Sequence, residues 1–461
     1  MTTFPYAALS DPARMAIEYP VGDDFLSRYV GMSADELRSI QEQRFAEVMR
    51  TAWTTPFYQR LWGEHGLEPG DALGLEALDR LPVFDKSRVM ADVAEHPPFG
   101  SLAIRTDRAA GPRILQTTSG TTGSPQPVLW GPWGREVQNA LLGRVYQWVG
   151  VDSNDVLHSV YGHGLVNGGH YAREAVTRYT DALLLSAGTG IETSSERQVQ
   201  VMAQFGATVL IGFADYFRRL ADVAEAAGLA PGRDIPVRLI VGQLPAGSRS
   251  DLEARWPGAV AFDWYGVADT GIVSAEGPAR DGHHVMSDAT VLELLDPDTG
   301  LEAQPEALGD MVVTSLGKSD LAPLIRFNTH DLTSALTGRG VADLPFQRTS
   351  GMQGRSDQMV KLRGINVYPT AIGALLANAP GVEGATGEYV CRLERRNDGA
   401  EHLVVLVEVA SPTPDAAAAI AAHLSTALGV KVGAETVGPG ATAEATGLTV
   451  RQKPSRLLDV R

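Results

Sequence analysis

Residues 208–241 contain the pattern that decides the fold: Thr208-Val-Leu-Ile-Gly-Phe213, an amphipathic stretch from Tyr216 to Ala227, and then Val237-Arg-Leu-Ile-Val241. Short apolar runs rich in β-branched residues predict strands, and the amphipathic stretch between them predicts a helix. A strand, a helix and a second strand in this order are typical of a parallel sheet with crossover connections. The segment therefore predicts an α/β domain.

The same alternation extends toward the N-terminus. Residues 156–160 and 182–185 read as strands, and 195–204 as a helix. Further upstream, Ser33 and Glu36 form a Ser-x-x-Glu capping box, which predicts the start of a scaffold helix. A large part of the chain before residue 245 is thus expected to be layered α/β structure.

The pattern changes toward the C-terminus. Residues 291–295 and 311–315 flank the turn-rich Asp296-Pro-Asp-Thr-Gly300, which predicts an antiparallel hairpin in a β-rich subdomain. Residues 403–409 predict a strand, and a helix from about Asp415 should end at Gly429. We expect a multi-layer α/β N-terminal domain (1–356) with a β-rich subdomain, followed by a small, mobile α+β C-terminal domain (357–461).

Composition limits the class of protein. The 461 residues are 44% hydrophobic and 20% charged, as in a folded globular protein of more than one domain. The net charge of −16 argues against nucleic acid or an anionic membrane as a partner. A single cysteine, Cys391, forms no intramolecular disulfide, and the chain shows neither a leader sequence nor an apolar stretch long enough to span a membrane. These features predict a cytoplasmic protein.

A glycine- and hydroxyl-rich run, Thr117-Thr-Ser-Gly-Thr-Thr-Gly-Ser-Pro125, is the first motif with chemical meaning. Backbone N–H and side-chain O–H groups of such a loop can converge on phosphate oxygens. The Walker pattern fails because no lysine stands in the loop. Taken alone, the run fits a phosphate-binding loop and a polar linker equally well.

Four further segments follow in order. Asp263-Trp-Tyr-Gly-Val-Ala-Asp269 offers a ring for stacking at Tyr265 and a hard oxygen ligand at Asp269. Ile325-Arg-Phe-Asn-Thr-His-Asp331 ends in an aspartate that could accept hydrogen bonds from a diol, or could merely be a turn residue. Residues 354–369 are dense in charge and glycine, and Lys453 lies in a basic tail that could also be only a solvated terminus.

In this order the five segments resemble the adenylate-forming superfamily of acyl-CoA ligases, and within it the phenylacetate-CoA ligase-like branch. The resemblance runs from about Arg44 to the last residue and includes Thr55-Pro-Phe-Tyr58 and the Leu-Pro-x-x-x-Lys element that ends at Lys86. It implies attack of a carboxylate on the α-phosphate of ATP, giving acyl-AMP and pyrophosphate, and then displacement of AMP by a thiol, usually of coenzyme A.

The resemblance also implies roles for individual residues. Lys453 would be the mobile catalytic lysine, Asp269 would bind Mg²⁺ where the family has Glu, and Asp357 would be the hinge. Tyr265 would stack on adenine beside Gly266, while Asp331 and Arg355 would bind the ribose and a nearby phosphate. The β- and γ-phosphates would lie on Thr117, Thr118, Ser119, Gly120, Thr121, Thr122 and Gly123, and Lys361 and Gly364 would lie on the loop at the thiol tunnel.

An acyl pocket is expected beside these residues. His163 could hydrogen-bond the substrate or simply pack. The neighbouring pair His283 and His284 is expected on a solvated loop, because the cysteines of a zinc site are absent. The predicted pocket residues are Tyr161, His163, Gly164, Gly188, Phe213, Tyr216 and Gly242.

Several positions depart from the family pattern, two of them at the predicted phosphate and Mg²⁺ sites. Ser124 stands where relatives place lysine, which would remove a cation facing pyrophosphate, and Asp269 is one methylene shorter than Glu. The main hypothesis is activation of a small, aromatic carboxylic acid and its transfer to coenzyme A. Alternatives are transfer to a carrier-protein thiol, an amine or another nucleophile, and a non-catalytic protein that binds nucleotide or acyl ligands. Dimers are common in the family, so a homodimer is an additional hypothesis.

Overall fold

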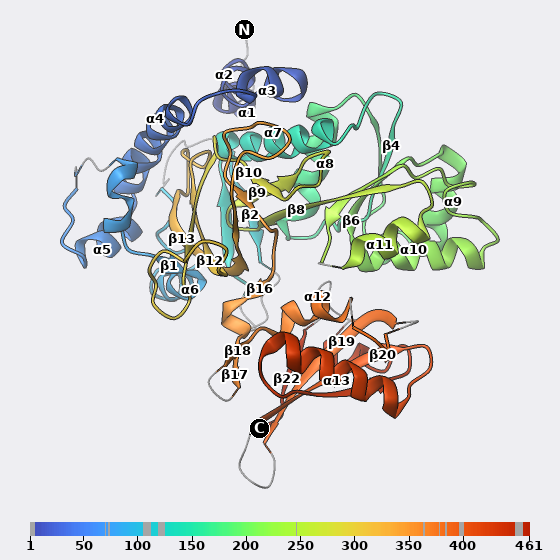
Figure 1. The fold of residues 1–461 in the computed structure, drawn as a ribbon. Coiled ribbons are helices and arrows are strands. Elements are labelled where there is room, and N and C mark those ends of the chain that lie inside the picture. Colours follow the sequence, from blue (N-terminus) through green and yellow to red (C-terminus); the bar gives the residue numbers. More distant parts are fainter. Residues whose placement is uncertain are drawn as a thin grey trace. The chain divides into compact units, whose positions relative to one another are not determined.

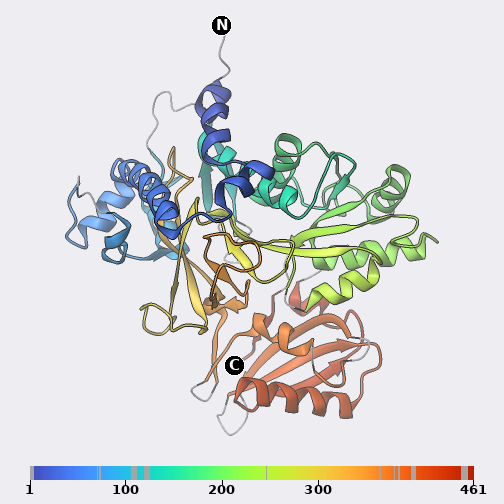
Figure 2. The same cartoon turned by 45° about the horizontal axis from the view of Figure 1, so that its top comes forward.

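The computed structural model describes residues 5–461 except 70, 72–73, 105–111, 119–124, 246, 363–364, 378, 383–384, 396–400 and 448–454; the side chains of Pro5, Lys361, Asn366 and Ala374 are also outside the description. The chain forms two compact units (Figures 1 and 2). The first contains residues 1–244, 252–329 and 333–351, and the second contains 245–251, 330–332 and 352–461.

A nine-stranded sheet organises the first unit, in the order β14-β15-β10-β9-β8-β7-β6-β4-β5. The strands from β5 to β8 pair in parallel, as the sequence predicts for β4 to β7, and those from β8 to β14 pair antiparallel. The strands are β4 (Val156–Ser159), β5 (Leu183–Ser186), β6 (Val209–Phe213), β7 (Leu239–Gln243), β8 (Val260–Val267), β9 (Gly271–Glu276), β10 (His283–Val285), β14 (Ala335–Leu336) and β15 (Arg348–Thr349).

Helices cover both faces of the parallel strands because successive strand residues point to opposite faces. Val209 and Ile211 belong to the apolar cluster shared with α7 and α8, whereas Leu210 between them joins the cluster shared with α9 and α10. Figure 1 shows α7 and α8 on one side of these strands and α10 on the other. The helices are α7 (Pro132–Trp148), α8 (Asn167–Tyr179), α9 (Ser195–Phe205), α10 (Ala214–Ala226) and α11 (Ser248–Arg255).

One prediction about this sheet is wrong. His283 and His284 do not lie on a solvated loop, because they form β10 together with Val285, and both side chains are buried. Strand β10 lies between β9 and β15, and its side chains are packed from other segments: the His284 ring contacts Trp148 of α7, and Gly351 lies against His283. A strand of three residues is too short to show a periodic pattern in the sequence.

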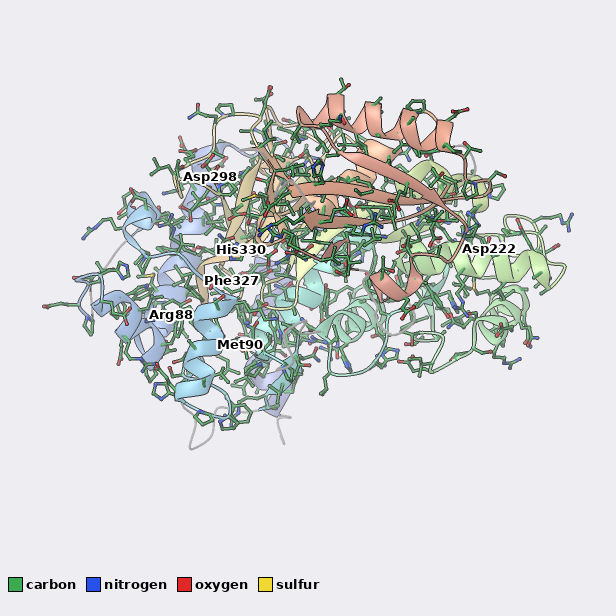
Figure 3. All side chains as sticks on the ribbon, turned by 90° about the horizontal axis from the view of Figure 1, so that it is seen from below. Arg88, Met90, Asp222, Asp298, Phe327 and His330 are labelled. Atoms are coloured by element: carbon green, nitrogen blue, oxygen red, sulfur yellow. The ribbon has the colours of Figure 1, made fainter. Side chains whose placement is uncertain are left out.

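A second sheet, in the order β1-β13-β12-β11, forms the predicted β-rich part. Strands β11 and β12 pair antiparallel, as predicted, and β1 joins β13 in parallel. Apolar residues of the N-terminal helices pack on this sheet; Figure 3 labels Arg88 and Met90 on α6. The elements are β1 (Phe84–Asp85), β11 (Thr290–Leu295), β12 (Gly309–Ser315), β13 (Leu324–Thr333), α4 (Ala34–Trp53), α5 (Pro56–Gly63), η1 (Leu75–Arg80) and α6 (Lys86–Glu95).

Three short helices and a hairpin are the remaining helices and strands in the described part of the first unit. The predicted capping box is confirmed: Ser33 Oγ accepts a hydrogen bond from the Glu36 N–H at the start of α4, and the Glu36 carboxylate accepts from the Ser33 N–H. Among the described residues, none of the helices is apolar over a length that could cross a membrane. The additional elements are α1 (Pro5–Ser10), α2 (Pro12–Glu18), α3 (Gly22–Tyr29), β2 (Ile114–Thr117) and β3 (Pro127–Trp130).

The second unit contains a four-stranded sheet in the order β21-β20-β19-β22, with α13 packed on it. Helix α13 ends at Gly429, as predicted, where φ is +67°. The predicted domain boundary between 356 and 357 stays a prediction. The elements are β16 (Gly354–Arg355), η2 (Ser356–Gln358), β17 (Val360–Leu362), β18 (Ile365–Val367), η3 (Pro369–Ala371), α12 (Ile372–Leu376), β19 (Ala385–Arg395), β20 (Glu401–Val409), α13 (Pro414–Leu428), β21 (Gly433–Val437), α14 (Ala443–Thr446) and β22 (Leu457–Asp459).

Candidate active site

The predicted acyl residues follow the carboxyl ends of parallel strands, where ligands bind in open α/β sheets. Tyr161 follows β4, Gly188 follows β5, and Phe213 ends β6. The Tyr161 and Phe213 rings contact each other edge to face with centroids 4.7 Å apart, and the Tyr161 hydroxyl donates to the Gly212 carbonyl at 3.3 Å. Gly242 on β7 pairs with Gly212 on β6. These residues therefore lie together at the carboxyl ends of neighbouring strands.

Tyr216 and His163 belong to polar networks beside that edge. The Tyr216 hydroxyl lies 3.0 Å from Ser195 Oγ and accepts from Gln198 Nε2 at 3.0 Å. His163 Nε2 lies 3.0 Å from Ser186 Oγ. Burial, with His170 and Arg173 nearby, lowers the pKa of His163, so its neutral form is favoured at pH 7.

A cavity of about 430 Å³ includes only part of the predicted acyl pocket. His163 and Gly164 line it, whereas Tyr161, Gly188, Phe213, Tyr216 and Gly242 do not. Its other walls come from β2, α7 and the start of α8. The lining residues are Ile114, Leu115, Gln116, Arg135, His163, Gly164, Leu165, His170 and Glu174.

Strand β8 carries Tyr265. We call Tyr265 and four residues near it the Tyr265 cluster: Leu244, Asp263, Tyr265, Gly266 and His283. The Tyr265 side chain is nearly buried, and its hydroxyl donates to Thr329 Oγ1 at 3.3 Å. A Cβ atom at Gly266 would lie 2.5 Å from the Gly271 carbonyl oxygen, so only glycine fits there. The backbone and hydroxyl contacts thus hold the Tyr265 ring in one place.

Asp269, in the turn after β8, lies among residues of the Asp269 cluster: Lys86, Thr118, Gln126, Asp269 and Lys318. Gln126 Nε2 donates to Asp269 Oδ1 at 2.5 Å, and Lys318 Nζ donates to the Asp269 carbonyl at 3.0 Å. Lys86 Nζ donates to Thr118 Oγ1 at 3.1 Å. Lys86 therefore contacts the described start of the predicted phosphate loop at Thr118, and Gln126, directly after the loop, contacts Asp269.

Burial changes the acid–base behaviour of this cluster. It raises the pKa of Asp269, an effect that Lys318, Gln126 and Lys86 oppose. It lowers the pKa of Lys318 to about 8, although Asp269 and Asp320 favour its charged form. The Lys318 ammonium lies 4.2 Å from the centre of the Trp130 ring, a cation–π contact.

The donor set around Asp269 fits Mg²⁺. Its carboxylate and the Thr118 hydroxyl are hard oxygen donors, the type that Mg²⁺ prefers. Across the described residues, no group of three or more His, Cys, Asp or Glu side chains could hold a metal. A single carboxylate is consistent with Mg²⁺ that takes its remaining ligands from substrate phosphates and water.

In the second unit, Asp331 and Arg355 meet as register partners of β13 and β16. Arg355 Nη1 donates to Asp331 Oδ1 at 2.5 Å, and its Nη2 donates to Asp357 Oδ2 at 2.7 Å. Asp331 is buried, whereas Asp357 is exposed. Arg355 thus links the predicted ribose residue to the predicted hinge.

Several predicted residues lie outside the description. Lys453, Gly364, Ser124 and the loop residues Ser119, Gly120, Thr121, Thr122 and Gly123 are not among the described residues, and Lys361 is described only by its backbone in β17. Thr117 and Thr118 are described: the Thr117 N–H donates to the Leu165 carbonyl and the Thr118 N–H to the Gln126 carbonyl. The roles of all these residues stay predictions.

Sequence reasoning assigned no role to Gln126, Lys318 or His283. Lys318 follows β12 and is 49 positions from Asp269, so spacing along the chain could not show their contact. Gln126 directly follows the predicted phosphate loop, and this position in the sequence could have indicated that it belongs to the site. His283 was noticed but assigned to a loop.

Known proteins with similar sequences identify the family. Residues 364–461 match the family model "AMP-binding enzyme C-terminal domain". Phenylacetate-coenzyme A ligase of Pseudomonas putida is 31% identical over 347 residues, 74% of this chain and 75% of the relative. The enzyme of that name from Thermus thermophilus is 31% identical over 388 residues, 82% of each chain. The chain belongs to the phenylacetate-coenzyme A ligase family.

Solved structures agree with this membership. The crystal structure of 2-hydroxyisobutyryl-CoA ligase in the postadenylation state with 2-HIB-AMP has a TM-score of 0.78 and 25% identity, covering 94% of this chain and 91% of that one. The same ligase with 2-HIB-AMP and CoA in the thioesterification state has a TM-score of 0.66 and 25% identity over the same shares. The predicted superfamily, fold class and AMP-forming acid–CoA ligase activity with ATP and coenzyme A are confirmed.

Proposed function

We propose that this member of the phenylacetate-coenzyme A ligase family activates a small aromatic carboxylic acid. The observation that carries the proposal is the 31% identity to phenylacetate-coenzyme A ligases over at least three quarters of their length.

In the first step a carboxylate oxygen of the acid attacks the α-phosphate of ATP, and pyrophosphate leaves. Tyr265 would stack on adenine, Asp331 and Arg355 would bind the ribose and a phosphate, and Lys453 would neutralise charge on the reacting carboxylate and α-phosphate. Asp269 would hold Mg²⁺, which when bound supplies positive charge to the phosphates. Thr117 and Thr118, with the rest of the loop to Gly123, would hold the β- and γ-phosphates.

In the second step the thiol of coenzyme A attacks the acyl carbon, and AMP leaves. Rotation at Asp357 would remove Lys453 and bring the loop of Lys361 and Gly364 to the thiol. A carrier-protein acceptor, a homodimer and a cytoplasmic location remain predictions.

The test is a pyrophosphate-release screen of aryl and alkyl acids at fixed ATP, Mg²⁺ and coenzyme A. Release that depends on the acid, and that is fastest with an arylacetic or benzoic acid, is the expected result. A rate that is the same without any acid would contradict ligase activity, and a clear preference for alkyl acids would contradict the aromatic substrate.

A further inference from the structure

His283 lies inside the first unit with both ring nitrogens engaged. Its Nε2 is 3.1 Å from Asp263 Oδ2, and its Nδ1 is 3.2 Å from Ser274 Oγ. A carboxylate oxygen only accepts hydrogen bonds, so Nε2 carries the proton, and in the neutral ring Nδ1 accepts from the Ser274 hydroxyl. Only 3% of His283 is exposed, and the Cα of Gly351 is so close that a Cβ there would lie 3.1 Å from Nε2.

Asp263 connects this histidine to the turn after β7. Asp263 Oδ1 accepts the Leu244 backbone N–H at 2.7 Å, while Oδ2 faces His283. Burial raises the pKa of Asp263, and the hydrogen bond from His283 acts in the opposite direction. The Asp263 side chain is only 16% exposed, and a largely buried carboxylate needs partners for both oxygens, because an unpaired one is costly. His283 therefore holds the carboxylate in the rotamer that fixes Leu244.

The same aspartate also fixes β8. Its backbone N–H donates to Glu276 Oε2 at 2.8 Å, and Tyr265 is two residues further along the strand, on the same face as Asp263. Gln243 Nε2 donates to the Gly266 carbonyl at 3.4 Å, a second link between the end of β7 and this part of β8. Leu244 and Tyr265 are thus held relative to each other by a short chain of buried contacts.

We propose that His283 is a positioning residue for the adenine of ATP: through Asp263 it fixes the backbone at Leu244 and the strand that carries Tyr265. The inference rests on the proposed function, in which adenine stacks on Tyr265. His283 does not touch the nucleotide in this account, so its loss affects ATP binding and leaves the chemical step unchanged.

The test compares His283→Leu with His283→Gln, whose amide nitrogen can still donate to Asp263. His283→Leu should raise KM for ATP, and the calorimetric Kd for ATP, by about 10-fold, because a hydrogen bond to a charged group is lost. kcat and the KM values for the acid and coenzyme A should change by less than about 2-fold, and His283→Gln should recover most of the ATP affinity.

The matched control is His284→Leu. His284 is the next residue of β10, equally buried, but its ring packs on Trp148 at 5.1 Å and its Nε2 is 3.5 Å from Asp281 Oδ1. A lower melting temperature with normal ATP affinity is expected. A similar rise in Kd for ATP in His284→Leu, or a normal Kd in His283→Leu, would overturn the proposal.

Two other outcomes also decide between the possibilities. If His283→Leu does not fold, Asp263→Asn should weaken ATP binding in its place, and normal ATP affinity in that variant would overturn the proposal. If wild type binds ATP but releases no pyrophosphate with any acid, the proposed function fails while the calorimetric comparison still tests His283.

Discussion

The Tyr265 cluster and the Asp269 cluster adjoin the same strand, β8, and are built in opposite ways. In the Tyr265 cluster, the Asp263 carboxylate accepts from the Leu244 N–H and faces His283 at 3.1 Å. The Tyr265 hydroxyl donates to Thr329. The Asp269 cluster places a lysine in a buried position, where its pKa falls to about 8. Hydrogen bonds hold the Tyr265 cluster, which carries little charge. The Asp269 cluster holds charged side chains in spite of the free-energy cost of burying them.

The difference fits what the two ends of ATP require. Adenine is flat and neutral, so a fixed ring and a fixed backbone bind it well. The triphosphate carries several negative charges, and preorganised positive charge is the most effective way to stabilise it during reaction. The contrast predicts that changes in the Tyr265 cluster alter affinity for ATP, whereas loss of cations at the reacting phosphate alters the chemical step.

The largest effect is expected for Lys453→Ala. Removing one donor that stabilises charge in the transition state should lower acid-dependent pyrophosphate release by about a hundred- to a thousand-fold, with a small change in KM for ATP. The control is Lys431→Ala, which removes an exposed lysine from the second unit and should leave the rate unchanged. Full activity of Lys453→Ala would show that the lysine is not catalytic.

A smaller effect, limited to the second step, is expected for Asp357→Pro. Proline fixes φ and should hinder rotation at the hinge, so thioester formation should fall on the order of 100-fold while acyl-AMP still forms. Asp357→Ala also loses the ion pair with Arg355 but keeps φ free, and it should retain thioester formation. The two half-reactions can be followed separately by quenched-flow chromatography; equal loss of both would refute the hinge assignment.

Next in size is Tyr265→Ala. Losing the stacking of one base should raise KM for ATP by about 10- to 100-fold. Tyr265→Phe keeps the ring and loses the hydroxyl that donates to Thr329 at 3.3 Å, so its KM should stay within about 3-fold of wild type. Steady-state kinetics at saturating acid separates the two variants, and equal KM values for both would argue against stacking.

The smallest expected effect is on how the free energy of unfolding depends on pH, through Lys318. Below pH 8 the ammonium is charged in the folded and unfolded states, and its burial lowers the free energy of unfolding. Between pH 8 and the ordinary lysine pKa, only the unfolded chain holds the proton, so this contribution to the free energy of unfolding rises with pH. From pH 8 to 9.5, wild type should gain on the order of 1 to 2 kcal/mol in the free energy of unfolding relative to Lys318→Met in urea titrations. An unchanged difference would refute the shifted pKa.

The sequence predicted what local patterns encode. Short apolar runs predicted the parallel strands β4 to β7, and the turn-rich segment between β11 and β12 predicted their hairpin. Gly429 predicted the end of α13. Pairing of β1 with β13 brings Phe84 beside Phe327, a contact between residues far apart in sequence that no local pattern encodes. Strand β10 was missed because contacts with distant residues, such as that of His284 with Trp148, bury two histidines that local sequence presents as polar.

The candidate site shows the same contrast between residues that sequence motifs indicate and residues that only the fold brings together. The pairing of Asp331 with Arg355 connects two residues that motif order had already selected. Gln126 and Lys318 were assigned no role, because their contacts with Asp269 depend on how three distant segments fold together. Sequence motifs thus indicated the residues that would touch the substrates, whereas the residues that hold them in place became visible only in the structure.

The central claim is that the acid becomes an adenylate and then a coenzyme A thioester. Mass spectrometry of a single turnover, with the best acid from the screen, tests it most directly. Acyl-AMP should accumulate without coenzyme A, and the acyl thioester and AMP should replace it when coenzyme A is added. Acyl-AMP that persists unchanged in the presence of coenzyme A would contradict the account.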